Sequence, residues 1–96
     1  MNFVYRTLIL GAQLYIEVTP GGQPLDLNDF TTCGNYFVRD SYVVNAPHTS
    51  WGFLWVLRSS GYIAQFWMPD NETSLYYRRG SIANWLSGWV TIYKSA

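Results

Sequence analysis

Two kinds of side chain in the sequence could carry out catalysis: carboxylates, and a hydroxyl or thiol nucleophile. Glycoside hydrolysis needs two facing carboxylates about 5 Å or about 6.5–9.5 Å apart, one of them with a raised pKa. The closest pair in the sequence, Asp70 and Glu72, lies in a turn-forming stretch where we expect both to be solvated. A nucleophile would have to use His48, the single histidine, as its base, and no Gly-x-Ser-x-Gly motif surrounds any serine. We therefore expect no enzymatic activity.

Metal and cofactor sites have equally little support in the sequence. Asp26, Asn28 and Asp29 resemble a fragment of a calcium loop, but the remaining ligand positions are missing, and turn formation explains all three. Cys33 is the single cysteine, which excludes an internal disulfide and a zinc site built from cysteines, and we expect a structural thiol. We predict no metal and no cofactor.

Aromatic side chains are the more informative class, because they make up 19% of the residues. A sugar ring presents apolar C–H faces that lie against flat aromatic rings, while neighbouring amides and charged groups bind its hydroxyls. Three candidates for such a platform are Trp67 with Gln65, Tyr76 with Arg78 on the adjacent strand, and Trp85 in its loop. The alternative is that these rings form the core or a contact between identical subunits.

The number of aromatic rings also bears on assembly. A domain of 96 residues buries only about 60–65% of its unfolded surface, so some rings must lie on the surface or in an interface. Four rings, however, are expected in the core: Trp51, Phe53, Trp55 and Trp89.

The charge of the chain and the length of its apolar runs argue against two classes of partner. Net charge is zero and charged residues make up 12%, whereas nucleic-acid binding depends on neutralising phosphates. Arg78 and Arg79 form the one basic pair, and neighbours on a strand point to opposite faces. The longest apolar run, 53–57, is far shorter than the ~20 residues of a membrane span. We predict neither nucleic-acid binding nor membrane insertion.

The elements that position these residues are predicted to be strands. Three aromatic and β-branched runs, 53–58, 62–68 and 74–79, are separated by turns at 59–61 and 69–72, which predicts an antiparallel three-stranded meander. On the middle strand, alternation places Ile63, Gln65 and Trp67 on one face and the even-numbered residues from 62 to 68 on the other.

The remaining segments predict further short strands and turns. Residues 1–18 predict two strands, 20–24 a linker, and 26–34 a helical turn or paired turns. Short strands are expected at 36–39 and 42–44, a loop at 45–50 and a last strand at 89–93. The fold class is all-β: a small antiparallel β-sandwich or partly open barrel with the meander at its centre. Residues 1–24 would be an N-terminal hairpin or the end of a shaft, and 25–96 the main β domain.

A set of dispersed motifs resembles a known family. In order, they are Asp26–Thr32 (DLNDFTT), Asn45-Ala46-Pro47, the meander, and Trp85 followed by Ser87-Gly88-Trp89. Together they resemble the knob domain of phage tail fibres and R-type pyocin fibres over about residues 25–94. The family commonly has Thr-Pro-Gly where this chain has Thr-Cys-Gly at 32–34.

The resemblance implies a non-catalytic virion structural protein that takes part in host-cell attachment. It implies a homotrimer that contacts other fibre or virion proteins and a bacterial surface polysaccharide or lipopolysaccharide. The protein would be made in the bacterial cytoplasm and reside in the virion tail or fibre. The knob could read the receptor itself or serve as a structural head, and the alternative function is a free-standing, lectin-like carbohydrate-binding module.

Overall fold

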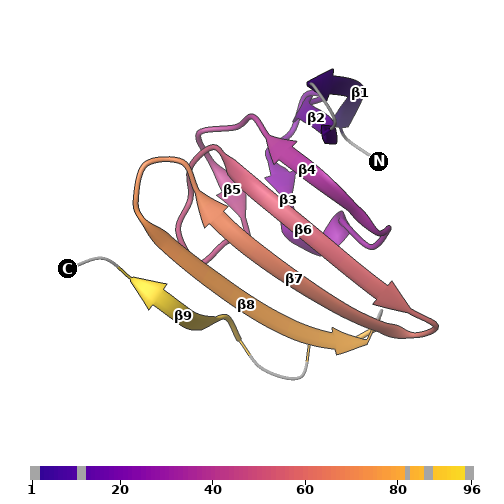
Figure 1. Cartoon of the computed structure of the whole chain (residues 1–96), viewed down its shortest axis with the longest axis vertical. Helices are drawn as coiled ribbons and strands as arrows, with labels where there is room; N and C mark the ends of the chain where they lie inside the picture. Colours follow the sequence, from indigo (N-terminus) through magenta and orange to yellow (C-terminus); the bar gives the residue numbers. More distant parts are fainter. Residues whose placement is uncertain (1–2, 11–12, 82, 86–87, 95–96) are drawn as a thin grey trace.

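The computed structural model describes residues 3–10, 13–81, 83–85 and 88–94, and it confirms an all-β fold (Figure 1). Within these residues the strands form one seven-stranded sheet, in the order β1-β2-β4-β6-β7-β8-β9, and one two-stranded sheet, β3-β5. The large sheet comprises β1 (Phe3–Leu10), β2 (Gln13–Pro20), β4 (Gly34–Val38), β6 (Gly52–Ser59), β7 (Tyr62–Pro69), β8 (Ser74–Ser81) and β9 (Val90–Lys94). The small sheet comprises β3 (Leu25–Asp26) and β5 (Val43–Val44), and a 3-10 turn, η1 (Leu27–Asp29), follows β3.

The predicted meander is confirmed as β6, β7 and β8, each paired antiparallel with the next. Its register places Leu54 opposite Trp67, and Trp67 opposite Tyr76. These three residues are buried, so this row of the sheet faces the core.

Two strand pairs depart from the antiparallel prediction. β2 pairs with β4 in parallel, and so does β3 with β5, whereas the other adjacent pairs of the large sheet are antiparallel. Parallel neighbours need a crossover of a dozen or more residues, and 21–33 supply it. This crossover contains β3 and η1. β1 and β2 form a hairpin, and both strands belong to the large sheet, with β2 pairing with β4. The division at residue 24 stays a prediction.

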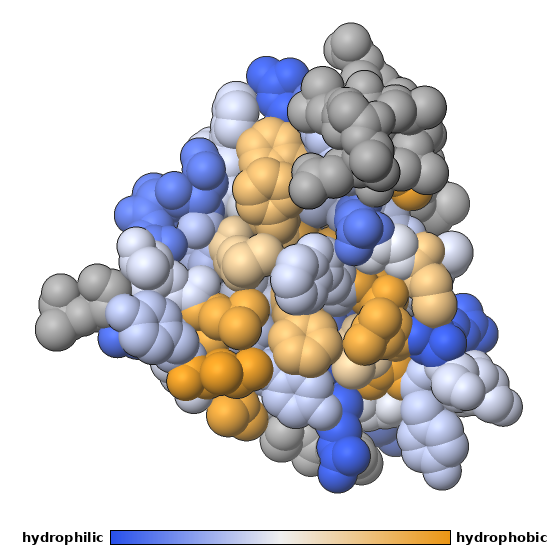
Figure 2. Space-filling view, viewed as in Figure 1, coloured by the Kyte–Doolittle hydropathy of each residue, from blue (hydrophilic) through white to orange (hydrophobic). Residues whose placement is uncertain are grey.

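The molecule has two layers, with the core between them. In Figure 1 the small sheet and η1 lie behind the large sheet. Asp26 caps η1, because its side chain accepts a hydrogen bond from the main-chain N–H of Asn28. Apolar side chains from both layers fill the space between: Val18, Leu25, Leu27, Phe30, Tyr36, Val38, Val43, Leu54, Val56, Ile63, Trp67 and Tyr76. The opposite face of the large sheet is turned toward the viewer in Figures 1 and 2.

Candidate functional site

Gln65 and Arg78, two predicted site residues, meet on the inner face of the sheet. They lie directly opposite each other on β7 and β8. The Gln65 amide nitrogen donates to the carbonyl oxygens of Leu27 (2.7 Å), the first residue of η1, and Phe30 (3.0 Å), the residue after it. Arg78 donates to the Gln65 amide oxygen through Nε (3.0 Å) and Nη2 (2.8 Å). The pair therefore attaches the crossover to the large sheet.

The Arg78 guanidinium is further fixed by two tryptophans and an asparagine. Its carbon lies 3.8 Å from the ring centre of Trp85 and 4.4 Å from that of Trp89, and Nη2 donates to Asn28 Oδ1 at 2.8 Å. Burial lowers the pKa of Arg78 to about 10, against an opposing effect of the nearby Asp26 charge. Arg78 thus stays charged at neutral pH. Trp85 was predicted in a ligand platform, and here one of its ring faces is covered by this cation.

The other two predicted platform residues are also buried. Trp67 has no exposed surface, and its indole N–H donates to the carbonyl oxygen of His48 at 3.0 Å. Tyr76 is 7% exposed, and its hydroxyl donates to Glu72 Oε1 at 2.6 Å. Gln65, like Trp67, is fully buried. The prediction that these side chains present an open surface for a sugar is therefore wrong, because their face of the sheet is the covered one.

A group of exposed and half-buried rings lies on the other side of the large sheet. We call this surface the outer aromatic face and define it by Phe37, Phe53, Trp55, Phe66 and Tyr77. Ring centres are 4.9 Å apart for Phe37 and Phe53, 6.2 Å for Trp55 and Phe66, and 5.0 Å for Phe66 and Tyr77. Figure 2 shows apolar and aromatic side chains across the middle of this surface, with hydrophilic residues mainly toward its margins.

Three rings that the sequence predicted in the core belong to this exposed surface or its border. Phe53 and Trp55 are each 43% exposed, and Trp51, whose ring contacts Phe37, is 40% exposed. The prediction is wrong because β6 turns Leu54 and Val56 inward, and alternation then sends its odd-numbered residues outward. Trp89, also predicted in the core, is half-buried and packs against the core cluster.

The outer aromatic face contains a shallow hollow of about 240 Å³. Its lining consists of Cys33, Gly34, Asn35, Trp55, Val56, Leu57 and Phe66. Asn35, Trp55 and Phe66 are consecutive partners across β4, β6 and β7, so they form one row on this face. The Cys33 thiol accepts a hydrogen bond from the main-chain N–H of Arg58 at 3.1 Å, which ties the thiol to the end of β6.

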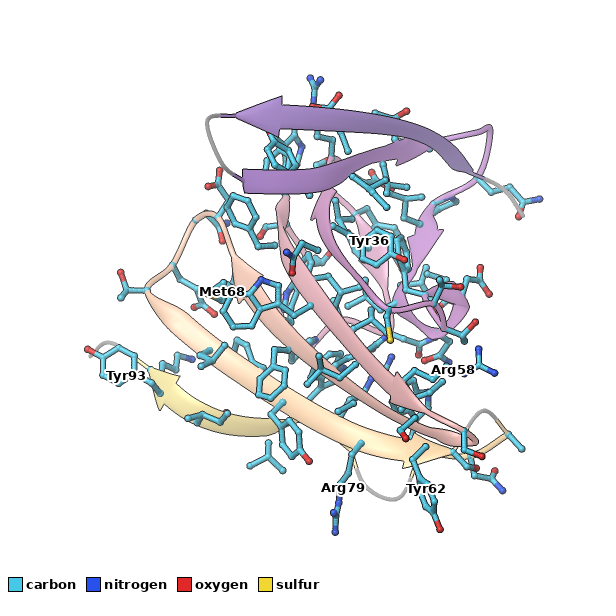
Figure 3. The ribbon with its side chains drawn as sticks, turned by 45° about the vertical axis from the view of Figure 1, so that its right-hand side comes forward. Tyr36, Arg58, Tyr62, Met68, Arg79 and Tyr93 are labelled. Carbon is cyan, nitrogen blue, oxygen red and sulfur yellow. The ribbon has the colours of Figure 1, made fainter. Side chains whose placement is uncertain are left out.

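Few charges accompany the rings on this side of the sheet. Glu17 lies opposite Phe37 in the β2–β4 register and forms an ion pair with Arg39 at 3.4 Å. Arg39 also lies 4.8 Å from the ring centre of Trp51. Arg79 is exposed and forms no ion pair with any residue that the structure describes. In Figure 3, Arg79 projects from the same margin of the sheet as Tyr62.

The turn between β7 and β8 does not have the properties of a glycosidase site. The hydrogen bond from Tyr76 lowers the pKa of Glu72, whereas a general acid requires a raised pKa. The same bond raises the pKa of Tyr76. His48 approaches Glu72 at 3.7 Å and Asn71 Oδ1 at 3.0 Å, which connects the 45–50 loop to this turn. Glu72 therefore serves as the acceptor of a structural hydrogen bond from Tyr76.

Comparisons with family models, curated proteins and solved structures give no match. The resemblance to fibre knobs therefore stays a prediction. Among the described residues, no three His, Cys, Asp or Glu side chains are grouped so that they could hold a metal ion. That part of the chain also contains no helix long and apolar enough to cross a membrane.

Proposed function

We propose that this chain is a non-catalytic attachment domain of the fibre-knob kind, which contacts a bacterial surface through its outer aromatic face. The observation that carries the proposal is the group of aromatic rings that the open face of the sheet leaves accessible. The covered face packs on the apolar core and also holds Gln65 and Arg78, while the open face displays Phe53, Trp55 and their neighbours. Extended exposed apolar surfaces on soluble domains mark sites that contact a partner.

The inner face supports this proposal by making the sheet a rigid base. Gln65 is hydrogen-bonded at both ends, and Arg78 is held from two sides by tryptophan rings and from a third by Asn28. Rings displayed on strands fixed in this way lose little conformational freedom on binding, which favours affinity.

Assembly into a homotrimer is part of the same proposal. All five residues of the edge strand β9 are exposed, among them Val90, Ile92 and Tyr93 at 50–57%. An exposed edge strand with apolar side chains is prone to pair with another chain. Packing against other copies would cover this edge and leave the outer aromatic face of each copy available at the fibre tip.

The proposal is tested by cell attachment and native mass. Fluorescently labelled protein is incubated with a panel of intact bacteria, and its mass is measured by light scattering after size exclusion. We expect a trimer that attaches to a subset of strains, and attachment that is lost in a Phe53→Lys variant with unchanged melting temperature. A protein that attaches to none of the strains, or whose attachment is indifferent to Phe53→Lys, contradicts the proposal.

A free-standing carbohydrate-binding module is the second candidate, and the hollow beside Trp55 favours it. The hollow combines aromatic rings with the Asn35 amide, the kinds of group that bind a saccharide. A monomer that binds saccharides and does not attach to cells would select this function.

A further inference from the structure

We infer that the hollow beside Trp55 is a subsite for one pyranose ring of a saccharide, with Trp55 and Phe66 as the stacking surface and Asn35 as the hydrogen-bonding group. The inference rests on the proposed binding role of the outer aromatic face and names the ligand class of that site. It also moves the saccharide site from the predicted residues on β7 and β8 to the opposite face of the sheet.

The size of the hollow limits what it can hold. Pockets for drug-sized ligands occupy about 300–1,000 Å³, and this one measures about 240 Å³. It therefore has room for a single ring-sized group. Tyr77 lies opposite Phe66 on the adjacent strand, so the next sugar of a saccharide chain can contact the Tyr77 ring.

The lining combines the two chemistries that a sugar ring needs. Trp55 and Phe66 lie 6.2 Å apart at an interplanar angle of 59°, so they form an angled apolar surface for the C–H groups of a pyranose. Asn35 is exposed at the next position of the same row. Its amide can donate to one hydroxyl and accept from another.

A second copy of the chain is the main competing occupant. A stable protein interface buries about 800 Å² on each partner and depends on many contacts. The ring-sized hollow with an open amide at its edge instead selects a small polar ligand with apolar faces, and that description fits a saccharide. Assembly through this face is therefore treated as an outcome of the test.

The test measures saccharide binding by the full chain and three single-residue variants. Binding is first measured on an array of bacterial surface polysaccharides and neutral oligosaccharides, and the tightest saccharide is then titrated by calorimetry. Trp55→Ala removes the stacking surface and Asn35→Ala removes the amide. Tyr62→Ala is the matched control, because Tyr62 is an exposed ring on β7, on the same side as Phe66, and does not line the hollow.

We expect Trp55→Ala to weaken binding by roughly tenfold or more. Asn35→Ala should weaken it by a smaller factor, and Tyr62→Ala should leave it unchanged, at equal melting temperatures. If Trp55→Ala does not fold, Asn35→Ala alone decides the result. Unchanged affinity in the folded Trp55 and Asn35 variants overturns the subsite.

The remaining outcomes separate the subsite from the proposed function. If no saccharide on the array binds more tightly than ~10 mM while the protein attaches to bacteria, the subsite is overturned and the attachment function stands. A change in native mass on Trp55→Ala, without a change in saccharide affinity, overturns the subsite and identifies the face as a contact between copies. Saccharide binding that depends on Trp55, without attachment to cells, supports the subsite and contradicts the attachment function.

Discussion

Replacing Arg78 by alanine should destabilise the domain by about 3 kcal/mol, although arginine is usually a surface residue. The substitution removes three hydrogen bonds, two to Gln65 Oε1 and one to Asn28 Oδ1, together with the contacts to two tryptophan rings. The Asn28 side is exposed, so water can replace that bond. The buried Gln65 oxygen loses both of its Arg78 donors, which costs about 1–3 kcal/mol, and the tryptophan contacts add about 0.5–2 kcal/mol. The variant no longer has to bury a charged guanidinium, and this gain offsets part of the two losses.

The measurement is urea unfolding at neutral pH, followed by near-ultraviolet circular dichroism. Arg79→Ala is the matched control, since Arg79 is the next residue on the same strand and is exposed on the other face. We expect that control to change stability by no more than about 0.5 kcal/mol. Equal stability of the two alanine variants would refute the assignment of Arg78 to a buried network.

A double substitution sharpens the same prediction. Replacing Arg78 by Met and Gln65 by Leu removes both polar partners, so no amide oxygen is left without a donor on that side. The double variant still leaves the carbonyl oxygens of Leu27 and Phe30 without their Gln65 donor. Because the buried amide oxygen is gone, we nevertheless expect the double variant to lose less stability than the sum of the two single losses. The double-mutant cycle then gives a negative interaction energy when destabilisation is counted as positive. Simple additivity would mean that the two side chains act independently.

Three further predictions concern other parts of the fold. Gly52→Ala should lower stability by about 1–3 kcal/mol in urea unfolding, because a Cβ there would lie 2.7 Å from a main-chain oxygen of β7 and 2.7 Å from the Trp67 ring. Trp67→Ala should cost about 3–5 kcal/mol in the same assay, and Trp55→Ala far less, since only the first ring is fully buried; similar losses would contradict the assignment of faces. The lowered pKa of Glu72 means that its bond from Tyr76 stabilises the fold above the ordinary glutamate range, and that this stabilisation is lost as the pH falls through the folded-state pKa. Glu72→Gln should therefore flatten the acid side of a melting-temperature profile, and an unchanged profile would count against this contribution.

The strands of the meander could be predicted from the sequence, whereas the covered face could not. Alternation correctly grouped Ile63, Gln65 and Trp67 on one side of β7, because strand periodicity follows from backbone geometry alone. Choosing the inner side requires knowing what packs against it. The polar side chain of Gln65 suggested that its face is solvated. In the structure its amide nitrogen instead donates to main-chain oxygens of Leu27 and Phe30, which are 35 or more residues away in sequence.

The path of the crossover between β2 and β4 was the second feature that the sequence did not predict. The crossover's turn-forming composition was visible in the sequence, and two of its side chains, Leu27 and Phe30, are buried in the core. The parallel pairing of β2 with β4 was not predicted, because the sequence shows short strands without showing their directions. Turn formation at Asp26 followed from its residue type, while its electrostatic effect on Arg78 depends on the completed fold.

The polar residues of the inner face explain why residue type alone did not identify the covered side of the sheet. A sheet with one covered face ordinarily turns its apolar residues inward and its polar residues outward. Here the inner side contains Gln65 and Arg78, and their mutual hydrogen bonds satisfy most of their polar atoms. A satisfied polar network can occupy a core without a large loss of stability, so the domain does not need the rings of β6 inside. Phe53 and Trp55 lie on the open face, each 43% exposed, where we propose that they contact a partner.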